Sequence, residues 1–295
     1  MVSLKGKITK AVSDPGLMGA WLYAKLFPAR CIRRNISLCQ RSGLRRPCFL
    51  LSFDCDTDLD VEVVGALHES LRASGIVPLY AVPGEMLASS PNTFQNLSSN
   101  GAIFLNHGYR RHAQVDPNTG EIESTFFYNL IPEKEWKLDI SLGDEAVSDV
   151  IGKRPTGFRT PHFATFETPQ ELYQLWTYLH ELGYRYSSST RPLFQLRYGP
   201  FFRREGIVEF PVSGCISQPE QIVDSWGLMQ TNPSGSKRLV SELENYLHLM
   251  KAGTPIFLNL YLDPSDISRD VEILDALRAF EPFAVSSFAD ILAMV

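Results

Sequence analysis

The stretch CFLLSFDCDTD, at residues 48–58, is the part of the sequence from which the fold is predicted. Its first six residues are apolar except for Ser52, which is typical of a short buried β-strand. Three aspartates follow at alternate positions, Asp54, Asp56 and Asp58. Alternate residues of an extended chain lie on one side, so these carboxylates would crowd together at the end of the strand. A metal ion or a shared proton would remove the cost of that crowding. An acidic loop in water is the alternative.

The charged residues are unevenly distributed along the 295-residue chain. Residues 1–46 contain ten Lys and Arg and one acidic residue, Asp14, so this segment has a net charge of +9. The whole chain has a net charge of −5, and residues 47–295 therefore carry −14. An acidic body of this kind argues against a nucleic-acid partner.

The cysteines and the N-terminus predict a cytoplasmic protein. There are five cysteines with no Cys-x-x-Cys pair, which indicates reduced thiols and not a disulfide framework. The sequence has no run of about 18 apolar residues, as a membrane span would need. Its N-terminus also lacks the pattern of a secretory signal.

Residues 1–46 are predicted to be a basic, partly helical extension of a main domain that covers residues 47–295. Residues 15–27, PGLMGAWLYAKLF, place apolar side chains at helical spacings, and three arginines follow closely. A basic amphipathic segment with Trp and Phe can lie on an anionic membrane, which predicts peripheral contact at its inner face. The alternative is a helix packed on the main domain with its basic end in water.

Strand-like and helix-like segments alternate from Pro47 onward. Strands are predicted at residues 48–53, 77–82, 102–105, 157–158, 184–187, 207–210, 255–262 and 283–286. Helices are predicted at residues 61–74, 132–151, 169–182, 237–250 and 271–280. Residues 108–131 are expected to form a long loop. Repeated strand–helix units indicate a parallel sheet, and seven or eight of them in about 250 residues favour a barrel.

The chemistry of such a barrel lies at the carboxyl ends of its strands. The sequence places ten candidate residues at or after these ends: Asp54, Asp56, His107, His112, Arg159, Pro161, His162, Asp224, Trp226 and Asp263. So many carboxylates and histidines, together with an arginine, at the ends of separate strands are not explained by contact with water alone. His68, His180 and His248 lie in helical patterns and are assigned no chemistry.

Five short motifs in this region resemble, in order and spacing, those of the polysaccharide deacetylase (NodB-homology) family. They are SFDCD, NHGYRRH, GFRTPH, DSW and NLYLDP, and the resemblance covers roughly residues 47–295. The run GKRPTGFRTP, at residues 152–161, is the most specific of these matches. The resemblance implies an α/β fold, namely a distorted barrel of seven or eight β/α units of the polysaccharide deacetylase type.

The resemblance also implies roles for the motif residues. Asp54 corresponds to the general base, and Arg159 to the arginine that holds this base. Asp56, His107 and His112 correspond to the ligands of a divalent metal ion, most simply zinc.

Three further residues are expected on the substrate side of the site, Pro161, Asp224 and Trp226. Asp224 corresponds to an aspartate that steadies the arginine, and Trp226 to a wall of the substrate groove. Core packing would explain Trp226 equally well.

The spacing of the histidines departs from the family pattern. The family's pair is four residues apart, but here Arg111 occupies that position and His112 is five residues from His107. Five residues on a helix turn about 500°, so the two rings would diverge by about 140°. The pair can share a metal only in an irregular loop, which Gly108 permits.

The fifth motif departs as well. Asp263 stands where the family has a histidine that acts as general acid. A carboxylic acid can donate a proton near neutral pH only if burial raises its pKa. His162 is the other candidate for this role.

The function that the resemblance implies is metal-dependent hydrolysis of an amide. The substrate would be an amino sugar or sugar conjugate that carries an N-acetyl or N-formyl group. The alternative, favoured by the two departures, is a non-catalytic domain that keeps the barrel and binds carbohydrate or a protein partner.

Overall fold

The strand predicted from residues 48–53 is present as β1 (Cys48–Asp54), the second strand from one end of the sheet, and all of its residues are buried. On one side β1 pairs in parallel with β10 (Phe257–Leu262). On the other side it pairs with β11 (Ala284–Val285) near its start and with β2 (Leu79–Val82) near its end. The computed structural model describes residues 14–116, 118–120, 122–229 and 234–295.

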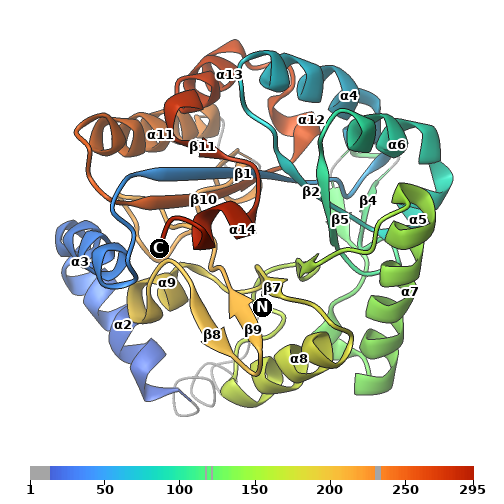
Figure 1. Cartoon of the computed structure of the whole chain (residues 1–295), viewed down its shortest axis with the longest axis horizontal. Coiled ribbons are helices and arrows are strands. Elements are labelled where there is room, and N and C mark those ends of the chain that lie inside the picture. The colour runs from blue at the N-terminus through green and yellow to red at the C-terminus, as the bar shows by residue number, and fades with distance from the viewer. Residues whose placement is uncertain (1–13, 117, 121, 230–233) are drawn as a thin grey trace.

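The main sheet has nine strands, in the order β10-β1-β2-β3-β6-β7-β9-β8, with β11 beside β1. The strands not yet given are β3 (Ile103–Asn106), β6 (Gly157–Phe158), β7 (Tyr186–Ser187), β8 (Phe202–Arg204) and β9 (Ile207–Glu209). Neighbouring strands are parallel, except that β8 runs antiparallel to β9. The sheet curls into a partial barrel (Figure 1), and the predicted distorted α/β barrel is therefore confirmed.

Helices cover the outside of this barrel (Figure 1). In chain order, the helices after β1 are α4 (Asp58–Ala73), α5 (Gly84–Ser89), α6 (Pro91–Ser99), α7 (Glu133–Ile151), α8 (Pro169–Glu181), α9 (Pro192–Tyr198), α10 (Ser225–Met229), α11 (Gly235–Lys251), α12 (Pro264–Ile267), α13 (Val271–Arg278) and α14 (Phe288–Leu292). The last of them, α14, lies over one end of the barrel and packs into its inner apolar cluster (Figure 1). Each helix predicted from periodicity is present. Its ends follow local signals: Gly152 ends α7 in the left-handed region, and Thr168 with Glu171 forms a capping box at the start of α8.

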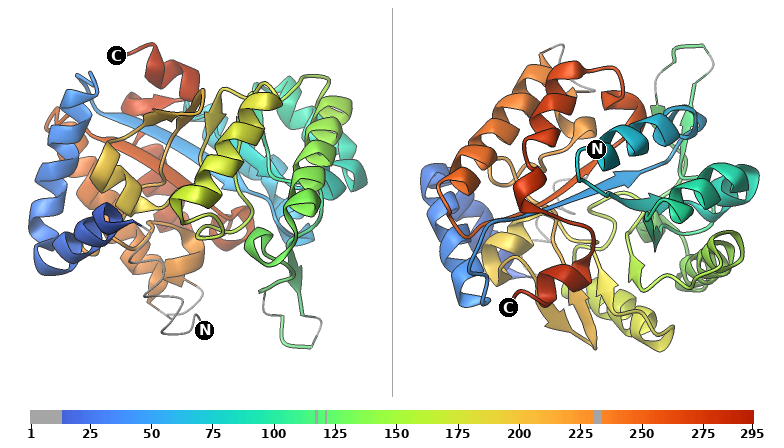
Figure 2. Two further views of the ribbon diagram at one scale, coloured as in Figure 1. Left: turned by 90° about the horizontal axis from the view of Figure 1, so that it is seen from below. Right: turned by 45° about the horizontal axis from the view of Figure 1, so that its top comes forward.

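The prediction that residues 108–131 form a long loop is partly wrong. This segment contains a hairpin, β4 (Ala113–Val115) with β5 (Ile122–Ser124), and a 3₁₀ turn at Tyr128–Leu130. Strands of three residues are too short to show a period of two in the sequence. The hairpin projects from the end of the barrel that is opposite to α14 (Figure 2, left).

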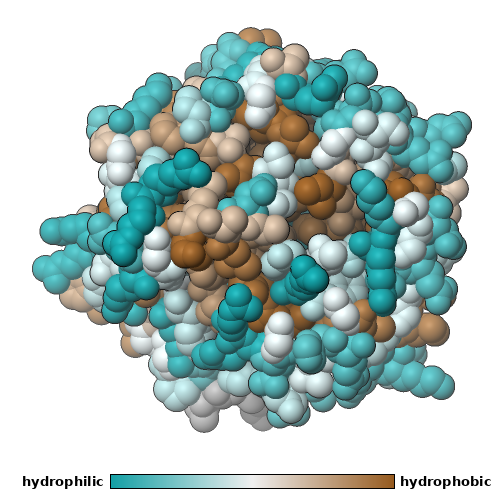
Figure 3. Space-filling view, viewed as in Figure 1, coloured by the Kyte–Doolittle hydropathy of each residue, from teal (hydrophilic) through white to brown (hydrophobic). Residues whose placement is uncertain are grey.

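Among the described residues, two helices precede the barrel, α2 (Pro15–Leu26) and α3 (Pro28–Arg41). Both pack against α9, and Arg34 donates a hydrogen bond of 2.6 Å to the carbonyl of Leu196. Cys39 and Leu44 join the apolar cluster inside the barrel. Hydrophilic side chains gather on the side where α3 lies, and hydrophobic ones lie nearer the middle of the same face (Figure 3).

None of the helices in the described ranges is both long enough and apolar enough to span a bilayer. Three basic residues of the N-terminal segment, Lys5, Lys7 and Lys10, lie outside the described residues.

The gap between β9 and β10 is bridged by one amide side chain. Asn259 of β10 is buried, and its Nδ2 donates to the carbonyls of Phe210 and Pro211 at 3.1 Å each. The N–H of Ser213 donates to the carbonyl of Asn259 at 3.0 Å. Asn259 therefore supplies the contacts that a full strand pair would otherwise make.

Substituting Asn259→Leu should destabilise the fold, because it removes the amide donor to the buried carbonyl of Pro211 and leaves that of Phe210 with only Ser188 Oγ. We expect a loss of about 2–4 kcal/mol in the free energy of unfolding, measured by urea denaturation. The control is Asn92→Leu on α6, where the side chain is exposed and a change within about 0.5 kcal/mol is expected. Equal losses in the two variants would contradict this role of Asn259.

Candidate active site

The site begins where the inward positions of β1 change from apolar to polar. Alternate residues of a strand face the same side. Cys48 and Leu50 belong to the apolar cluster inside the barrel. The next two inward positions, Ser52 and Asp54, are polar and buried. The end of β1 therefore delivers a carboxylate to the interior of the barrel.

The inward positions of β10 change in the same way. Phe257 belongs to the inner apolar cluster, Asn259 closes the barrel, and Tyr261 and Asp263 line a pocket of about 420 Å³. Seven of the candidate residues line this pocket, namely Asp54, Asp56, His107, His162, Asp224, Trp226 and Asp263. The predicted convergence at the carboxyl ends of the strands is thus observed.

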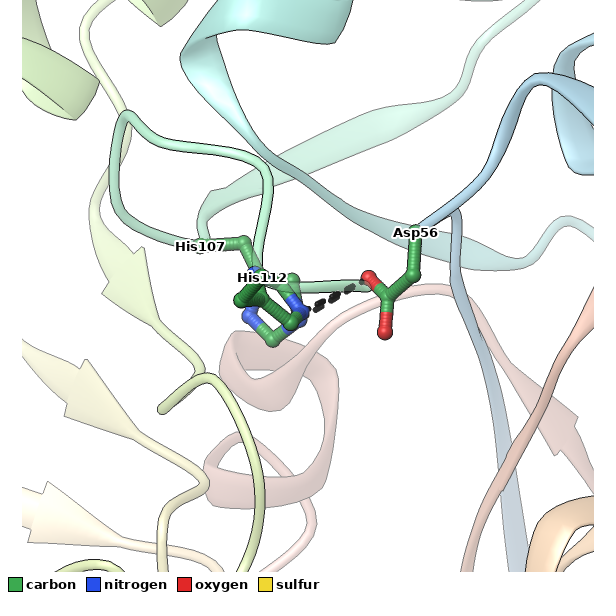
Figure 4. Close-up of side chains that lie close together, drawn as sticks. All are labelled: Asp56, His107 and His112. Carbon is green, nitrogen blue, oxygen red and sulfur yellow. Dashed lines mark ion pairs between the residues drawn. The ribbon is translucent and has the colours of Figure 1, made fainter. Parts of the chain in front are cut away.

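Asp56, His107 and His112 form a cluster whose ligand atoms all lie within 4.8 Å of one another (Figure 4). The Oδ1 atom of Asp56 lies 3.0 Å from the Nε2 atom of His112 and 3.4 Å from that of His107. Two ligands that are each about 2.1 Å from a metal lie about 3.0–3.4 Å apart, depending on the coordination angle. These separations therefore match the edges of a metal coordination shell.

The chemistry of the three ligand atoms also fits a metal ion. Asp56 Oδ1, His107 Nε2 and His112 Nε2 are buried, and within the described ranges they make no hydrogen bond. Such atoms are rare in folded proteins and need an explanation. The Nδ1 atom of His107 lies 2.8 Å from the carbonyl of Arg159 and can donate to it, which leaves the Nε2 lone pair free for a metal.

Asp139 of α7 shapes the loop that brings the two histidines together. Its carboxylate accepts hydrogen bonds from the N–H groups of Tyr109 and Arg110, from Arg110 Nε, and from the hydroxyl of Tyr128. Gly108 lies beneath it with a φ of 76°, and a Cβ there would be 2.6 Å from Asp139 Oδ2. The segment is an irregular loop and not a helix, so the five-residue spacing does not separate the rings.

Asp54 is paired with the buried guanidinium of Arg159. Arg159 Nη1 donates to both carboxylate oxygens, at 3.0 and 3.3 Å, and Nη2 donates to Ser52 Oγ at 2.9 Å. The rings of Phe163 and Tyr261 each lie 5.4 Å from the guanidinium. This arrangement fixes the orientation of the Asp54 carboxylate.

The two neighbouring aspartates differ in their ionisation. Burial raises the pKa of Asp54 above its usual range, although the charge of Arg159 opposes the rise. Burial would also raise the pKa of Asp56, but His112 and His107 outweigh it and hold this pKa well below its usual range. Asp56 is thus suited to bind a cation and Asp54 to accept a proton.

Asp224 lies in the pocket, but its expected contact with the arginine is wrong. It accepts hydrogen bonds from the Tyr261 hydroxyl at 2.6 Å and from the N–H of Gly227 at 2.7 Å. The side chain of Arg159 is instead bonded to Asp54 and Ser52. Asp224 therefore reaches the arginine only through the ring of Tyr261. Burial raises the pKa of Asp224 to about 6.

Asp263 lies at the end of β10, in the wall of the pocket. Ser225 Oγ donates to its Oδ2 at 3.1 Å, and the N–H of Asp263 donates back to Ser225 Oγ at 2.9 Å. Burial raises the pKa of Asp263 well above its usual range, and the nearby carboxylates of Asp60 and Asp56 raise it further. The condition for Asp263 to act as a proton donor is met.

His162 adjoins the metal-ligand cluster without belonging to it. Its ring lies 4.9 Å from that of His112, and its Nε2 atom is 3.1 Å from the carbonyl of His112. Burial, together with the neighbouring His112, lowers the pKa of His162 to about 4. The backbone at His162 has a φ of 56°, which is unusual for a residue other than glycine. Thr165 holds the turn through the carbonyls of Pro161 and His162.

Aromatic and aliphatic side chains form the remaining wall of the pocket: Ile122, Phe127, Phe163, Ile222, Trp226 and Tyr261. Trp226 is 39% exposed, so it lies at the rim and is not core packing. Pro161 is buried beside Gly108 and is not among the lining residues, which argues against the expected contact with substrate.

Sequence reasoning missed several residues that build the site. Ser52 was visible only as the one polar residue in an apolar strand. Asp60 accepts hydrogen bonds from Thr57 and Ser265 and so ties the start of α4 to the end of β10. Asp139 lies in a helix about thirty residues away from the loop that it holds, and no local signal identifies it.

Solved structures with this fold include deacetylases. A putative polysaccharide deacetylase from Mycobacterium smegmatis has 17% sequence identity and a TM-score of 0.56, over 84% of this chain and 89% of that one. A probable polysaccharide deacetylase from Pseudomonas aeruginosa PAO1 has 12% identity and a TM-score of 0.57, over 86% and 92% of the chains. PuuE allantoinase has 13% identity and a TM-score of 0.56, over 84% and 90%. The fold implied by the motif resemblance is therefore confirmed.

Comparison at the level of sequence gave no match. No protein-family model matches this chain, and no curated protein matches it.

Substituting Asp139→Asn should weaken metal binding, because an amide cannot accept all four of the hydrogen bonds that hold the histidine loop. We expect the dissociation constant for Zn²⁺ to rise about 10- to 100-fold, measured by competition with a chromophoric chelator. The matched control is Asp144→Asn on the same helix, which removes an acceptor for Tyr184 and Arg154 outside this loop. It should lower stability but leave the Zn²⁺ affinity unchanged. Equal Zn²⁺ affinities in both variants and the unaltered chain would contradict the role of Asp139.

Proposed function

We propose that this chain is a metal-dependent hydrolase that removes an N-acyl group, acetyl or formyl, from an amino sugar or sugar conjugate. The observation that carries the proposal is the cluster of Asp56, His107 and His112. Its three ligand atoms converge beside a carboxylate, Asp54, that is held by a buried arginine.

One carboxylate and two imidazoles would hold the metal through Asp56 Oδ1, His107 Nε2 and His112 Nε2. When bound, the ion would lower the pKa of a water molecule and polarise the acyl oxygen. We propose zinc, which suits this mixed set of ligands and binds such sites more tightly than the cobalt or iron dications.

Asp54 would take a proton from the attacking water. Its raised pKa makes it a better base, and Arg159 keeps its carboxylate directed into the pocket. The new carbon–oxygen bond forms as this proton moves to Asp54, and the carbon–nitrogen bond then breaks.

Asp263 would give the proton that the departing amine needs. Its raised pKa keeps the carboxylic acid protonated, and Ser225 holds Oδ2 so that the group faces the pocket. His162 is less suited to this role, because its Nε2–H can already be donated to the carbonyl of His112. It would instead support the position of His112.

The pocket suits a sugar ring that carries an amide. Trp226, Phe163 and Tyr261 offer flat apolar faces against which the carbon–hydrogen face of a sugar can pack. The acidic and histidine side chains line the same pocket, with Tyr261 bonded to Asp224, and the amide would lie beside them.

A non-catalytic, deacetylase-like domain was the alternative. One of its grounds was the five-residue spacing of the histidines, which the structure accommodates in an irregular loop. The other was Asp263, whose raised pKa supports proton donation. Both observations favour the hydrolase.

The proposal is tested with purified protein loaded with Zn²⁺ and assayed for release of acetate or formate. The substrates are N-acetylated and N-formylated amino sugars and their oligomers, with allantoin added because an allantoinase shares the fold. Asp54→Asn should lower turnover by at least about 10³-fold while one equivalent of metal stays bound. Asp56→Asn should lose both the metal and the activity.

Metal content is measured by plasma mass spectrometry on the same samples. Less than a tenth of an equivalent of metal in the unaltered chain after loading would overturn the proposal. Equal metal loss in the Asp54 and Asp56 variants would show that the roles of the two residues are shared.

Asp263 is tested through pH. If it is the proton donor, activity should fall as the pH rises through its raised pKa, and Asp263→Asn should lose about 10²- to 10⁴-fold in turnover. Asp263→His should keep part of the activity, because an imidazolium can also donate. Comparable loss in both variants would contradict the assignment.

The raised pKa of Asp263 also predicts how the stability of the fold depends on pH. The carboxyl group ionises near pH 4 in the unfolded chain but at a higher pH in the fold, so the unfolded chain binds fewer protons between these values. The ionisation of Asp263 therefore lowers the stability of the fold as the pH rises through this window. Metal-free Asp263→Asn should lose less stability than the unaltered chain between pH 4 and neutrality, as measured by urea denaturation.

A further inference from the structure

The outer face of α2 carries a cluster of exposed apolar side chains. Of the thirteen large hydrophobic residues that are exposed in the described ranges, four fall within seven consecutive positions: Trp21, Leu22, Leu26 and Phe27. Leu26 is 68% exposed and Leu22 is 46% exposed. Residues four apart on a helix share a face, so Leu22 and Leu26 lie on one side of α2. This set of four residues is called the α2 patch below.

Basic side chains continue from the α2 patch along α3. The exposed residues of α3 include Arg30, Arg33, Arg34 and Arg41, while the buried ones are Cys31, Leu38 and Cys39. Spacings of three and eleven residues place Arg30, Arg33 and Arg41 on one side of the helix, and these three form the arginine stripe. Arg34 lies at the edge of this side and donates to the carbonyl of Leu196. The guanidinium of Arg30 lies 4.9 Å from the ring of Phe27, so the basic stripe begins at the edge of the α2 patch.

Most of the positive charge of this face has no acidic partner among the described residues, and Lys25, which pairs with Glu220, is the exception. Asp14 is the only acidic residue between positions 14 and 46, and it is paired with Arg197 and caps the start of α2. Among the described residues, no carboxylate pairs with Arg30, Arg33 or any later arginine up to position 46. Residues 14–46 contain seven Lys and Arg and one acid, a net charge of +6, whereas residues 47–295 carry −14. The charge of the described chain is therefore polarised towards these two helices.

The α2 patch is held rigidly on the domain. Lys25 pairs with Glu220 at 2.5 Å, and Arg34 is bonded to the carbonyl of Leu196. Ala24 and Cys31 pack with Leu196 in a small buried cluster. The inner side of α2 and α3 is therefore committed to the fold, while the outer side is free to bind a partner.

We propose that the α2 patch and the arginine stripe of α3 dock this protein on an anionic lipid surface. Trp, Phe and Leu side chains enter the boundary between headgroups and acyl chains, and arginines bind lipid phosphates. An anionic surface repels the acidic body and attracts only this side, which fixes the orientation of the docked protein. The segment that contains Glu220 continues into Ile222 and Asp224 of the pocket, so the docking face and the active site are joined by a short stretch of chain.

The test is flotation of the full chain with vesicles, which requires no enzymatic activity and is independent of the proposed hydrolysis. Vesicles of phosphatidylcholine alone are compared with vesicles that contain about 30% phosphatidylglycerol, at about 50 mM and about 500 mM salt. We expect binding to the anionic vesicles only, and a loss of at least about tenfold in affinity at the higher salt.

Two pairs of variants locate the docking face. Leu26→Glu should weaken binding by at least about tenfold, whereas Leu138→Glu, an exposed leucine of α7 on the opposite side of the barrel, should not (Figure 1). Both variants should keep the unfolding midpoint of the unaltered chain, because the altered side chains are exposed.

The second pair tests the basic stripe. Arg30→Glu with Arg33→Glu should abolish the salt-sensitive binding, while Lys134→Glu with Lys153→Glu should preserve most of it, although both pairs change the net charge equally.

Three outcomes would overturn the proposal. The first is a full chain that stays unbound at low salt. The second is a control variant that loses as much binding as its matched partner. The third is a protein that is dimeric by analytical ultracentrifugation and becomes monomeric with Leu26→Glu, since the α2 patch would then be an interface between two copies of the chain.

Discussion

The structure depends on one buried cation, the guanidinium of Arg159. It is inaccessible to solvent, and a buried charge is tolerated only when it is paired and hydrogen-bonded. Its side chain pairs with Asp54 and Ser52 of β1, while its own carbonyl lies 2.8 Å from His107 Nδ1 and its N–H donates to Asn106. A single residue thus fixes the base, orients a metal ligand and joins the ends of three strands. Loss of Arg159 would leave the Asp54 carboxylate buried and unpaired. An uncompensated buried charge strongly destabilises the folded state.

Each of the five carboxylates around the pocket is stabilised in a different way. Asp54 has Arg159, Asp56 has the two histidines, and Asp224 has the hydroxyl of Tyr261. Asp60 is satisfied by Thr57 and Ser265, and Asp263 accepts a hydrogen bond from Ser225 while burial raises its pKa. Only Asp56 lies beside side chains, those of His107 and His112, whose nitrogen lone pairs could bind the same cation. The crowding of three aspartates inferred from the sequence is therefore relieved in three ways: Asp54 pairs with Arg159, Asp56 belongs to the candidate metal cluster, and Asp58 lies at the surface beside Arg111.

The sequence was sufficient to predict the strands, helices and site residues that short-range patterns encode. Apolar runs located β1 and β10, helical periodicity located the long helices, and five motifs placed Asp56, His107 and His112 near one another. Contacts between segments that are distant in sequence were not predictable. The bonding of Asp139 to the loop around Gly108 depends on where α7 packs, and the partner of Asp224 depends on the register of β10, which carries Tyr261. The β4–β5 hairpin was missed because strands of three residues carry too little pattern.

The two departures from the expected motifs differ in kind. The extra residue between His107 and His112 is a geometric change, which the loop absorbs while both rings stay within reach of Asp56. Asp263 is a chemical change, because it alters the charge of the site during a reaction. A histidine acid starts as a cation and ends neutral, whereas a carboxylic acid starts neutral and ends as an anion. In the proposed role, Asp263 therefore ends the step as an anion, while Asp54 holds the proton taken from the attacking water. The raised pKa of Asp263 favours return of a proton to its carboxylate. The site would thus be reset by a proton that moves within the pocket, whereas a neutral imidazole at the same position would draw a proton less strongly near neutral pH.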